Sequence, residues 1–591
     1  MPIQKIETDV LVIGGGGAGF RAAIAARERG VRALLVSKGP LARCGASPMA
    51  GADFTLDGAS MNGLGRDGDT NDSMDKCFND IVTQGWFLNN QKLVRHYVET
   101  APRLLKDLMD YGIDIKLSDQ RMIFFSGLHL MDILLKKARS VGVDLLEDVM
   151  VLELLRRDGG VTGALCLGIR TGEFIAVSCR AVVMASGGWH KAFWPNTGMR
   201  DLSGEGMAMA QRAGATLGNM EFITFCCNIM YEPPMWRGSL APYMLGLIAG
   251  GRLCNRKGEE FLKQYDPSVV KTGTSTEWNK SFISMASMKE VRAGNGFENG
   301  GVHFDRGEVS WDLMKMIATF IFPDWKYKAI DLSEWGRMLE AGEPIEVGPA
   351  VEYFDGGIIV NDRFESGVPG LYAAGECCLG AFGSNRVFSA ITEMLVQGLT
   401  AGENAAAFAG GSAQVAPDAS LVNALVHAAE APLAGKGNIS PARARRIIQE
   451  RAHAQLGPVR NGNELSDFIA FLERVRANEL GSLTAASPGR IYNKEWIDAL
   501  ELGNMVQLLE VSARCALART ESRGVHFRED CPVTDNDAWL KESTATIGDG
   551  GFDIGSRAAT VTSMSPPGGK VPYLDMMKRM MESHSDTGGK H

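Results

Sequence analysis

Six residues near the N-terminus, Gly14-Gly15-Gly16-Gly17-Ala18-Gly19, constrain the fold of this chain more than any other feature. They stand between a short apolar run with strand character, Thr8–Ile13, and a segment with helical spacing, Arg21–Arg29. A second apolar run, Ala33–Val36, follows. This β-α-β order predicts an α/β protein built around a parallel sheet that is buried on both faces.

The glycines fit the spacing G-x-G-x-x-G. In this pattern one glycine makes the turn, another lets the backbone approach a pyrophosphate, and the third lets helix and strand pack closely. The N-terminus of the helix then stabilises the phosphate charges. We therefore predict a dinucleotide site that includes Gly14, Gly16, Gly17, Ala18 and Gly19.

A second glycine-bearing segment indicates which dinucleotide is bound. Val368–Glu376 reads as a turn and a buried strand followed by Gly375-Glu376. The simpler alternative is a strand and turn with an exposed acid. The second strand ends at Ser37, where a nicotinamide site usually has an acidic residue for the ribose. Two such segments about 360 residues apart instead suggest one extended cofactor held from both sides, as FAD is held.

Composition excludes several other classes of protein. The 591 residues carry 61 basic and 70 acidic side chains, a net charge of −9, which argues against nucleic acid or an anionic membrane surface as the main partner. No uncharged apolar run reaches the ~18–20 residues of a membrane-spanning helix. The first thirty residues do not resemble a signal peptide. A cytoplasmic location, peripheral to the membrane at most through partner subunits, is expected.

The eleven cysteines lack any C-x-x-C pair. Neither an iron–sulfur cluster nor a structural zinc therefore has its usual spacing, and no metal site is predicted. The odd count favours a reducing compartment and mostly free thiols. If electrons pass through this protein, another chain is expected to carry the metal clusters.

Further segments give the chain a resemblance to a known family over about residues 7–555. It resembles the flavoprotein subunit of succinate dehydrogenase, fumarate reductase and L-aspartate oxidase. The segments that carry the resemblance, besides the first glycine run, are Leu35–Lys38, Ser203–Ala215, Gly250–Glu259, Gly356–Ile358, Gly375–Cys377, Gly383–Arg386 and Arg519–Asp530.

The resemblance implies an FAD-binding domain of the two-dinucleotide-binding, Rossmann-like type, in residues 1–235 and 351–410. An inserted α+β capping domain would span 236–350, a C-terminal helical domain 420–545 and a tail 546–591. Iron–sulfur subunits and a small-molecule substrate are the implied partners. The Glu521–Asp530 run is interpreted as a buried ion-pair network rather than as catalytic. The further FAD-binding positions it implies are Ser37, Lys38, Cys44, Gly45, Ala46, Ser47, Gly51, Gly187, Glu205, Gly375, Glu376, Ile391 and Thr392.

The chain departs from the family at the flavin attachment site. Covalent members bond FAD through the histidine of R-S-H-T, and Arg43–Ser47 places Gly45 at that position. Without an imidazole there, FAD is expected to be non-covalent. The absence of a covalent link argues against succinate oxidation, because this link raises the reduction potential of the flavin in the family.

The dicarboxylate site departs further. Ile223 and Glu352 replace two substrate histidines, and Lys280 aligns with the proton-donating arginine. Among the expected carboxylate ligands only Arg386 remains. A dicarboxylate in a dry pocket needs about two donor clusters, since an unpaired desolvated carboxylate costs several kcal/mol. Neither fumarate nor succinate is therefore expected to be a good substrate.

Three residues are the predicted catalytic set. Lys280 is a candidate general acid, against the alternative of a solvated lysine in a surface loop. Arg386 is a candidate clamp for a carboxylate or carbonyl oxygen, against a structural role beside the flavin. Glu352 is the candidate for further proton chemistry.

Three functions remain open on the sequence. The first is an oxidoreductase that reduces or forms an activated C=C bond in a substrate other than a simple C4 dicarboxylate. The second is a flavin electron-relay subunit without its own substrate. The third is an oxyanion reductase similar to adenylylsulfate reductase, whose R-S-G-A segment Arg43–Ala46 resembles.

Overall fold

A computed structural model describes residues 3–50, 53–240, 242–243, 251–265, 279–305, 310, 312, 337–338, 340–343, 345–386, 388–435 and 437–585. Its core is a five-stranded sheet in the order β18-β11-β2-β3-β7, and every neighbouring pair in it is parallel. The predicted β-α-β unit and the α/β class are thereby confirmed. The strands are β2 (Val10–Ile13), β3 (Ala33–Val36), β7 (Asp144–Leu146), β11 (Ala181–Met184) and β18 (Leu371–Ala373).

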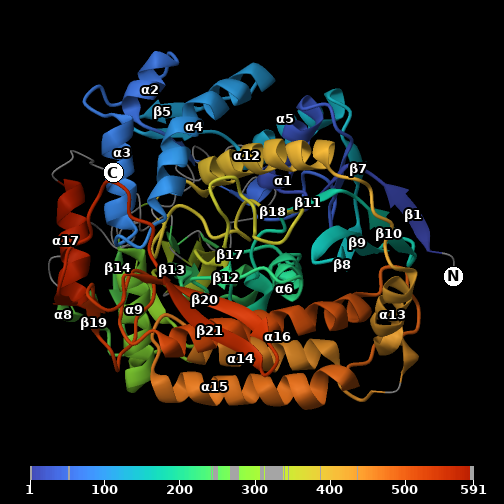
Figure 1. Cartoon of the computed structure of the whole chain (residues 1–591). Coiled ribbons are helices and arrows are strands. Elements are labelled where there is room, and N and C mark those ends of the chain that lie inside the picture. The colour runs from blue at the N-terminus through green and yellow to red at the C-terminus, as the bar shows by residue number, and fades with distance from the viewer. Residues whose placement is uncertain are drawn as a thin grey trace.

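Two helices, α1 (Gly17–Glu28) and α12 (Ala390–Gly411), lie together on one side of this sheet (Figure 1). Glycines on α12 allow their close approach. A Cβ atom on Gly398 would lie 2.4 Å from the carbonyl oxygen of Ala18, and one on Gly402 would lie 2.3 Å from that of Ala22. Side chains at these positions would therefore push the two helices apart.

The remainder of the predicted FAD-binding domain adds smaller sheets and helices around this core. The strand order is β1-β10-β9-β8 in one sheet and β4-β6-β5 in another. Their bounds are β1 Gln4–Glu7, β4 Asp53–Thr55, β5 Leu117–Asp119, β6 Met122–Phe124, β8 Val149–Arg157, β9 Gly160–Gly168 and β10 Phe174–Ser178. The helices are α2 Gly58–Gly63, α3 Met74–Gln84, α4 Gln91–Tyr111, α5 Gly127–Ser140 and α6 Glu205–Arg212.

The segment predicted to be a capping domain contributes to a sheet in the order β13-β16-β15-β14. Its strands β13 (Ile223–Met230) and β16 (Ile345–Phe354) pair with each other. This sheet therefore begins before residue 236 and ends after residue 350, the bounds expected from the sequence, because β13 lies before the first bound and β16 continues past the second. The other described elements are β14 Arg252–Cys254, β15 Val302–Asp305, α8 Leu262–Tyr265 and α9 Lys280–Glu290.

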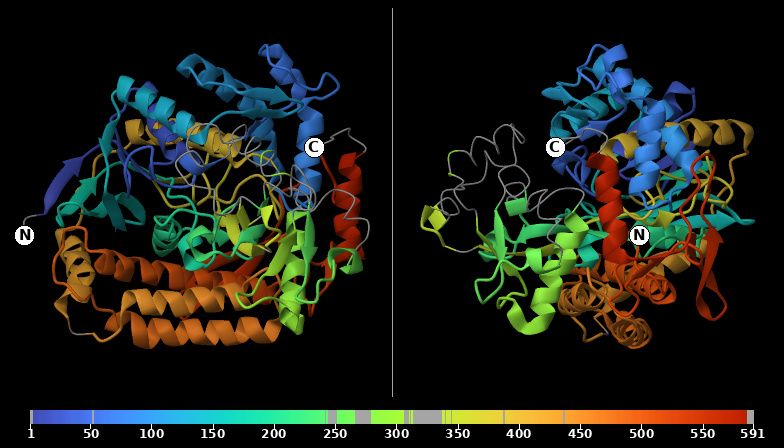
Figure 2. Two further views of the ribbon diagram at one scale, coloured as in Figure 1. Left: turned by 180° about the vertical axis from the view of Figure 1, so that it is seen from behind. Right: turned by 90° about the vertical axis from the view of Figure 1, so that its left-hand side faces the viewer.

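The C-terminal part contains the expected helices. Three of them, α14, α15 and α16, run side by side along one edge of the molecule, and the predicted capping domain lies at one end of them (Figures 1 and 2). The helices are α13 Ala419–Glu430, α14 Pro441–Gln455, α15 Gly462–Arg474 and α16 Lys494–Ala518. No helix in the described ranges is long and apolar enough to cross a membrane.

The segment after residue 545, expected to be a tail, contains regular structure. The hairpin β20-β21 joins the sheet β17-β12-β20-β21, and β22 pairs with β19 before helix α17. The last six residues, 586–591, lie outside the described residues. The bounds are β12 Leu217–Gly218, β17 Gly357–Ile358, β19 Val533–Asp535, β20 Lys541–Gly548, β21 Gly551–Ala558, β22 Lys570–Pro572 and α17 Tyr573–Ser585.

Candidate active site

The glycine run forms the tight turn that the sequence predicted. Gly14 follows β2 with φ +124°, and a Cβ atom there would lie 2.0 Å from the carbonyl oxygen of Ala185. A Cβ atom on Gly19 would lie 1.9 Å from the carbonyl oxygen of Gly14. Neither position accepts a side chain, so both the turn and the helix–strand packing need glycine.

The N-terminus of α1 is suited to an anion. Its N-cap residue, Gly16, provides no side-chain cap, so the amides of the first turn depend on other groups. The Gly17 amide donates to Oγ of Ser47 at 3.1 Å, which also brings Ser47 beside the turn. Amides and helix dipole together favour a phosphate at this end.

The other predicted cofactor residues meet at the same edge of the sheet. Ser37 follows β3, Gly187 follows β11, and Gly375-Glu376 follows β18. Carboxyl ends of parallel strands share one edge, where ligands of such sheets bind. Gly375 has φ +78°, and a Cβ atom on it would lie 2.9 Å from that of Ala18. The two glycine segments, distant in sequence, are therefore neighbours in space.

Lys38 and Glu205, two further predicted cofactor residues, contact each other. The Nζ atom of Lys38 bonds the carboxylate of Glu205 and lies 2.6 Å from Oε1 of Glu501 in α16. Burial alone would lower the pKa of Lys38, yet the two carboxylates raise it above its ordinary value. Glu501 also pairs with Lys191, so this buried network joins the predicted cofactor edge to the helical domain.

Gly45, which stands where the resemblance implies the flavin-linking histidine of covalent family members, has open space around it. Gly45 has φ +74°, no atom lies within 4 Å of a Cβ atom built on it, and its amide donates to Oδ2 of Asp201 at 2.8 Å. Its neighbour Cys44 is buried, with Sγ 3.1 Å from Oγ of Ser37, and burial raises the pKa of this thiol. Ala46 is exposed. Gly51 lies outside the described residues.

The last two predicted cofactor residues, Ile391 and Thr392, lie in the first turn of α12. Their amides both donate to Oγ of Ser389, and Oγ1 of Thr392 accepts the Thr55 amide at 2.8 Å. Three features of this edge fit an FAD molecule. They are the N-terminus of α1, which has no side-chain cap, the glycine turns at Gly14 and Gly375, and the open space at Gly45.

Lys280 and Glu352 form a direct pair. Lys280 is the first residue of α9 and is only 2% exposed, and its Nζ lies 2.7 Å from Oε2 of Glu352 in β16. Nζ also lies 5.6 Å from the centre of the Tyr243 ring. The alternative of a solvated lysine in a surface loop is therefore wrong, because burial and the ion pair fix this side chain inside the cap.

Arg386 lies beside a group of buried acids. Its guanidinium stands 4.5 Å over the ring of Tyr353, whose hydroxyl donates to Oε2 of Glu393 at 3.3 Å. Burial raises the pKa of Glu393 to about 7, against the lowering effect of the Ala381 amide and Arg386. Sequence reasoning missed Glu393, although an acid inside the largely apolar helix α12 was a usable signal.

A second buried carboxyl group, Asp355, lies on the same side. Burial raises its pKa to about 7, while the hydrogen bond that Thr224 donates to Oδ2 at 2.7 Å opposes the rise. Its Oδ1 has no hydrogen-bond partner among the described residues. Ile223, at one of the lost histidine positions, is fully buried in β13 and offers no donor.

The segment after Gly187-Gly188 connects these parts. Trp189 is buried and stacks on Phe354 at 4.3 Å, as a core residue. The imidazole Nε2 of His190 bonds the carbonyl oxygen of Glu352 at 2.7 Å and lies 3.6 Å from Oε1 of Glu376. Burial raises the pKa of Glu376, while His190 opposes the rise.

The predicted ion-pair network near the C-terminus is present. Arg519 pairs with Glu221 at 2.6 Å and with Glu521 at 2.9 Å, and Arg523 pairs with Glu521 at 2.8 Å; all four side chains are fully buried. The described residues contain no group of three or more metal-ligating side chains. All eleven cysteines lie in the described ranges, and each is a free thiol.

Comparison with known proteins covers nearly the whole chain. The FAD binding domain family matches residues 9–390, and the fumarate reductase flavoprotein C-terminal family matches residues 445–572. One subunit of the fumarate reductase (CoM/CoB) of Methanothermobacter marburgensis is 30% identical over 555 residues, which cover 90% of this chain and 96% of that protein.

Solved structures share the fold. The Sdh1 complex of Mycobacterium smegmatis in the apo form matches with a TM-score of 0.82 and 27% identity, over 95% of this chain and 96% of that chain. An adenosine-5-phosphosulfate reductase in complex with sulfite matches with a TM-score of 0.76 and 20% identity, over 95% and 98%. At that identity the second likeness concerns the fold alone.

Proposed function

The chain belongs to the fumarate reductase and succinate dehydrogenase flavoprotein family, and on that premise we propose that it is an FAD-dependent oxidoreductase that acts on an activated C=C or C–C bond of a substrate other than fumarate or succinate. FAD, when bound, supplies hydride transfer at N5. The residues of this chain must then place the substrate and exchange one proton with its second carbon.

The Lys280–Glu352 pair carries this proposal. A lysine whose charge is already balanced by a carboxylate 2.7 Å away is a poor ligand for a substrate carboxylate, and Glu352 would repel one directly. Ile223 provides no donor in place of the second histidine. These residues therefore suit a substrate with at most one carboxylate, because a second one would be desolvated without a partner.

Each member of the predicted set then has a distinct role. Lys280 gives a proton to the substrate carbon in reduction and takes it back in oxidation. Glu352 is 19% exposed and returns a proton to Lys280 from solvent. Arg386 binds the single carboxylate or the carbonyl oxygen that activates the double bond, for which a guanidinium offers two parallel donors.

FAD is proposed to be held without a covalent bond, since Gly45 provides no imidazole at the attachment position. The electron partner is proposed to be a separate iron–sulfur subunit. The absence of C-x-x-C pairs supports this proposal, and so does the relative that is one subunit of a fumarate reductase. The free thiols favour a reducing compartment, and we propose a cytoplasmic location.

The decisive experiment uses the FAD-loaded protein, purified under anoxic conditions with the gene products that accompany it. The reduced flavin is mixed with fumarate, with monocarboxylic enoates and with uncharged enones, and its reoxidation is followed by absorbance. We expect monocarboxylic enoates to reoxidise it and fumarate to do so at least about 100-fold more slowly, a difference of roughly 2.7 kcal/mol. Rapid reoxidation by fumarate would overturn the substrate assignment. If no compound of the panel reoxidises the flavin, the result would favour the electron-relay function.

A further inference from the structure

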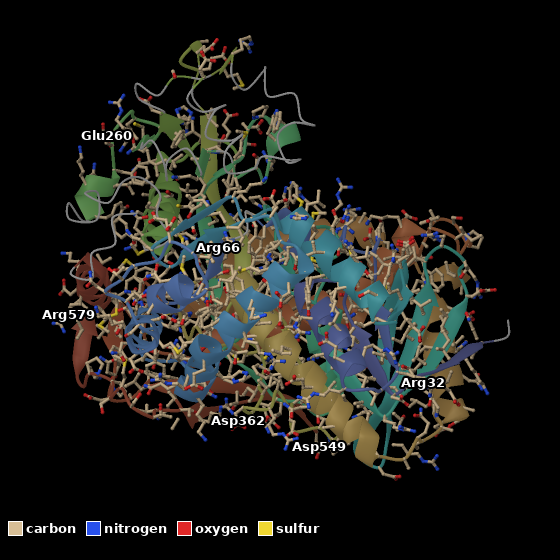
Figure 3. All side chains as sticks on the ribbon, turned by 90° about the horizontal axis from the view of Figure 1, so that it is seen from above. Arg32, Arg66, Glu260, Asp362, Asp549 and Arg579 are labelled. Atoms are coloured by element: carbon tan, nitrogen blue, oxygen red, sulfur yellow. The ribbon has the colours of Figure 1, made fainter. Side chains whose placement is uncertain are left out.

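The C-terminal helix α17 buries one face, and its contacts include α3 and the strands β19 and β22. Its first residue and those three, four and seven positions later are buried, which is the spacing of one helical stripe: Tyr573, Met576, Met577 and Met580. They belong to the same apolar cluster as Phe282 and Met285 of α9, the helix that begins with Lys280. Figure 3, seen from above, shows Arg579 of α17 and Glu260 of the cap on the same side of the molecule.

The same helix also holds the end of α3. The side-chain amide of Gln84 donates to the carbonyl oxygen of Met580 at 3.2 Å. The backbone carbonyl oxygen of Gln84 in turn accepts from Nδ2 of Asn385 at 3.4 Å. Next to it, the carbonyl oxygen of Gly85 accepts from the amide of Ser384 at 3.2 Å and from its hydroxyl at 3.1 Å. These bonds fix the segment that immediately precedes Arg386.

A second path from α17 reaches the same segment from the other side. The Tyr573 hydroxyl donates to the carbonyl oxygen of Gly524 at 2.7 Å. The adjacent amide, that of Val525, donates to the carbonyl oxygen of Ser384 at 3.0 Å. The Tyr573 ring stacks on Trp86 with 5.4 Å between ring centres. The hydrogen bonds thus form a closed ring that begins and ends on α17 and passes through the residues before Arg386.

We propose that α17 positions Arg386, with Tyr573 and Gln84 as the positioning residues. The helix begins at Tyr573, directly after residue 572, where the match to the family's C-terminal domain ends. Residues of α17 and α9 belong to one apolar cluster, so the proposed support of Arg386 adjoins the helix that begins with Lys280. The proposal rests on the proposed function only in taking Arg386 as the substrate ligand.

The first test concerns the segment itself and needs no substrate. Tyr573→Phe removes one hydroxyl and keeps the stack on Trp86, and Gln84→Met removes the donor to Met580 at similar volume. In the FAD-loaded protein we expect the Ser384 and Val525 amides to exchange with deuterium about five-fold faster in each variant, as the loss of one hydrogen bond predicts. Tyr231→Phe is the matched control, because its buried hydroxyl donates to the carbonyl oxygen of Pro349 at 2.6 Å, away from this ring. Unchanged exchange at Ser384 and Val525 in both variants would overturn the proposal.

The second test separates this inference from the proposed function. With an enoate that turns over, Tyr573→Phe is expected to raise KM about five-fold with little change in kcat, and to have no further effect when Arg386 is already alanine. An equal effect in both backgrounds would show that Tyr573 does not act through Arg386. Faster exchange with unchanged KM would leave the support by α17 intact and instead refute Arg386 as the substrate ligand.

Discussion

Nζ of Lys280 and Oε2 of Glu352 lie 2.7 Å apart, which joins the start of α9 to the end of β16. Lys280 is 2% exposed and Glu352 is 19% exposed, so the pair meets solvent on the Glu352 side. The pair links two elements of the predicted cap, and under the proposed function it is the feature that disfavours a dicarboxylate.

Replacement of Lys280 by methionine is expected to lower kcat by about 10²–10⁴, the usual contribution of a positioned proton donor. The visible spectrum of the bound flavin should remain unchanged, since Lys280 lies in α9 and the residues predicted to hold FAD lie at the carboxyl edge of the parallel sheet. Lys289→Met is the matched control, because Lys289 lies on the same helix and faces the Phe527 ring at 4.9 Å. Normal turnover in the Lys280 variant would remove this residue from the mechanism.

The open position at Gly45 predicts that acid precipitation of the pure protein releases all of its flavin. The yellow colour should stay in the supernatant, and the denatured band should show no flavin fluorescence on a gel. Gly45→Ala adds a methyl group in open space but at φ +74°, so we expect a cost of about 1 kcal/mol from backbone strain alone. A fluorescent band would disprove non-covalent binding.

The contact between α1 and α12 predicts a strong effect of a single methyl group. Gly398→Ala would bring Cβ to 2.4 Å from the carbonyl oxygen of Ala18, so we expect a loss of about 1–3 kcal/mol in stability and weaker FAD retention, because Ala18 lies in the glycine turn. Gly410→Ala on the same helix is the control, since no atom lies within 4 Å of its Cβ position. Equal melting temperatures and FAD dissociation rates for the two variants would contradict this packing.

The buried carboxyl groups predict how stability depends on pH. The pKa of Asp355 is raised to about 7 from 3.8, so the folded protein holds a proton that the unfolded chain releases above pH ~4. The stabilisation of the folded protein by this proton on Asp355 is fully present below pH ~4. It is lost as the pH rises to about 7, at up to about 1.4 kcal/mol per pH unit.

Thermal midpoints measured from pH 5 to 8 test this dependence. Asp355→Asn keeps an acceptor for Thr224 and should flatten the fall in midpoint over this range. The exposed Asp362→Asn should leave the wild-type slope unchanged. If the Asp355 variant follows the wild-type curve, the carboxyl group is ionised throughout. Glu393, with its pKa also raised to about 7, is expected to account for the slope that remains.

How much could be predicted from the sequence depended on the distance between interacting residues. The turn at Gly14–Gly19 and its strands were predictable because glycine spacing and apolar runs are local signals. The likeness to family motifs added the residues of the cofactor edge. The pairing of Lys38 with Glu501 and the hydrogen bond from Gln84 to Met580 were not predictable. They join segments more than 400 residues apart in each case, and nothing in the local pattern specifies such a partner.

The parallel pairing of β11 with β18, in which Val182 lies opposite Leu371, has a consequence for synthesis of the chain. The whole segment between β11 and β18, which includes the predicted cap, is synthesised before β11 can pair with β18. Until then the nascent sheet exposes an open hydrogen-bonding edge, a state that invites mispairing. Maturation of this flavoprotein is therefore expected to depend on factors that shield that edge during translation.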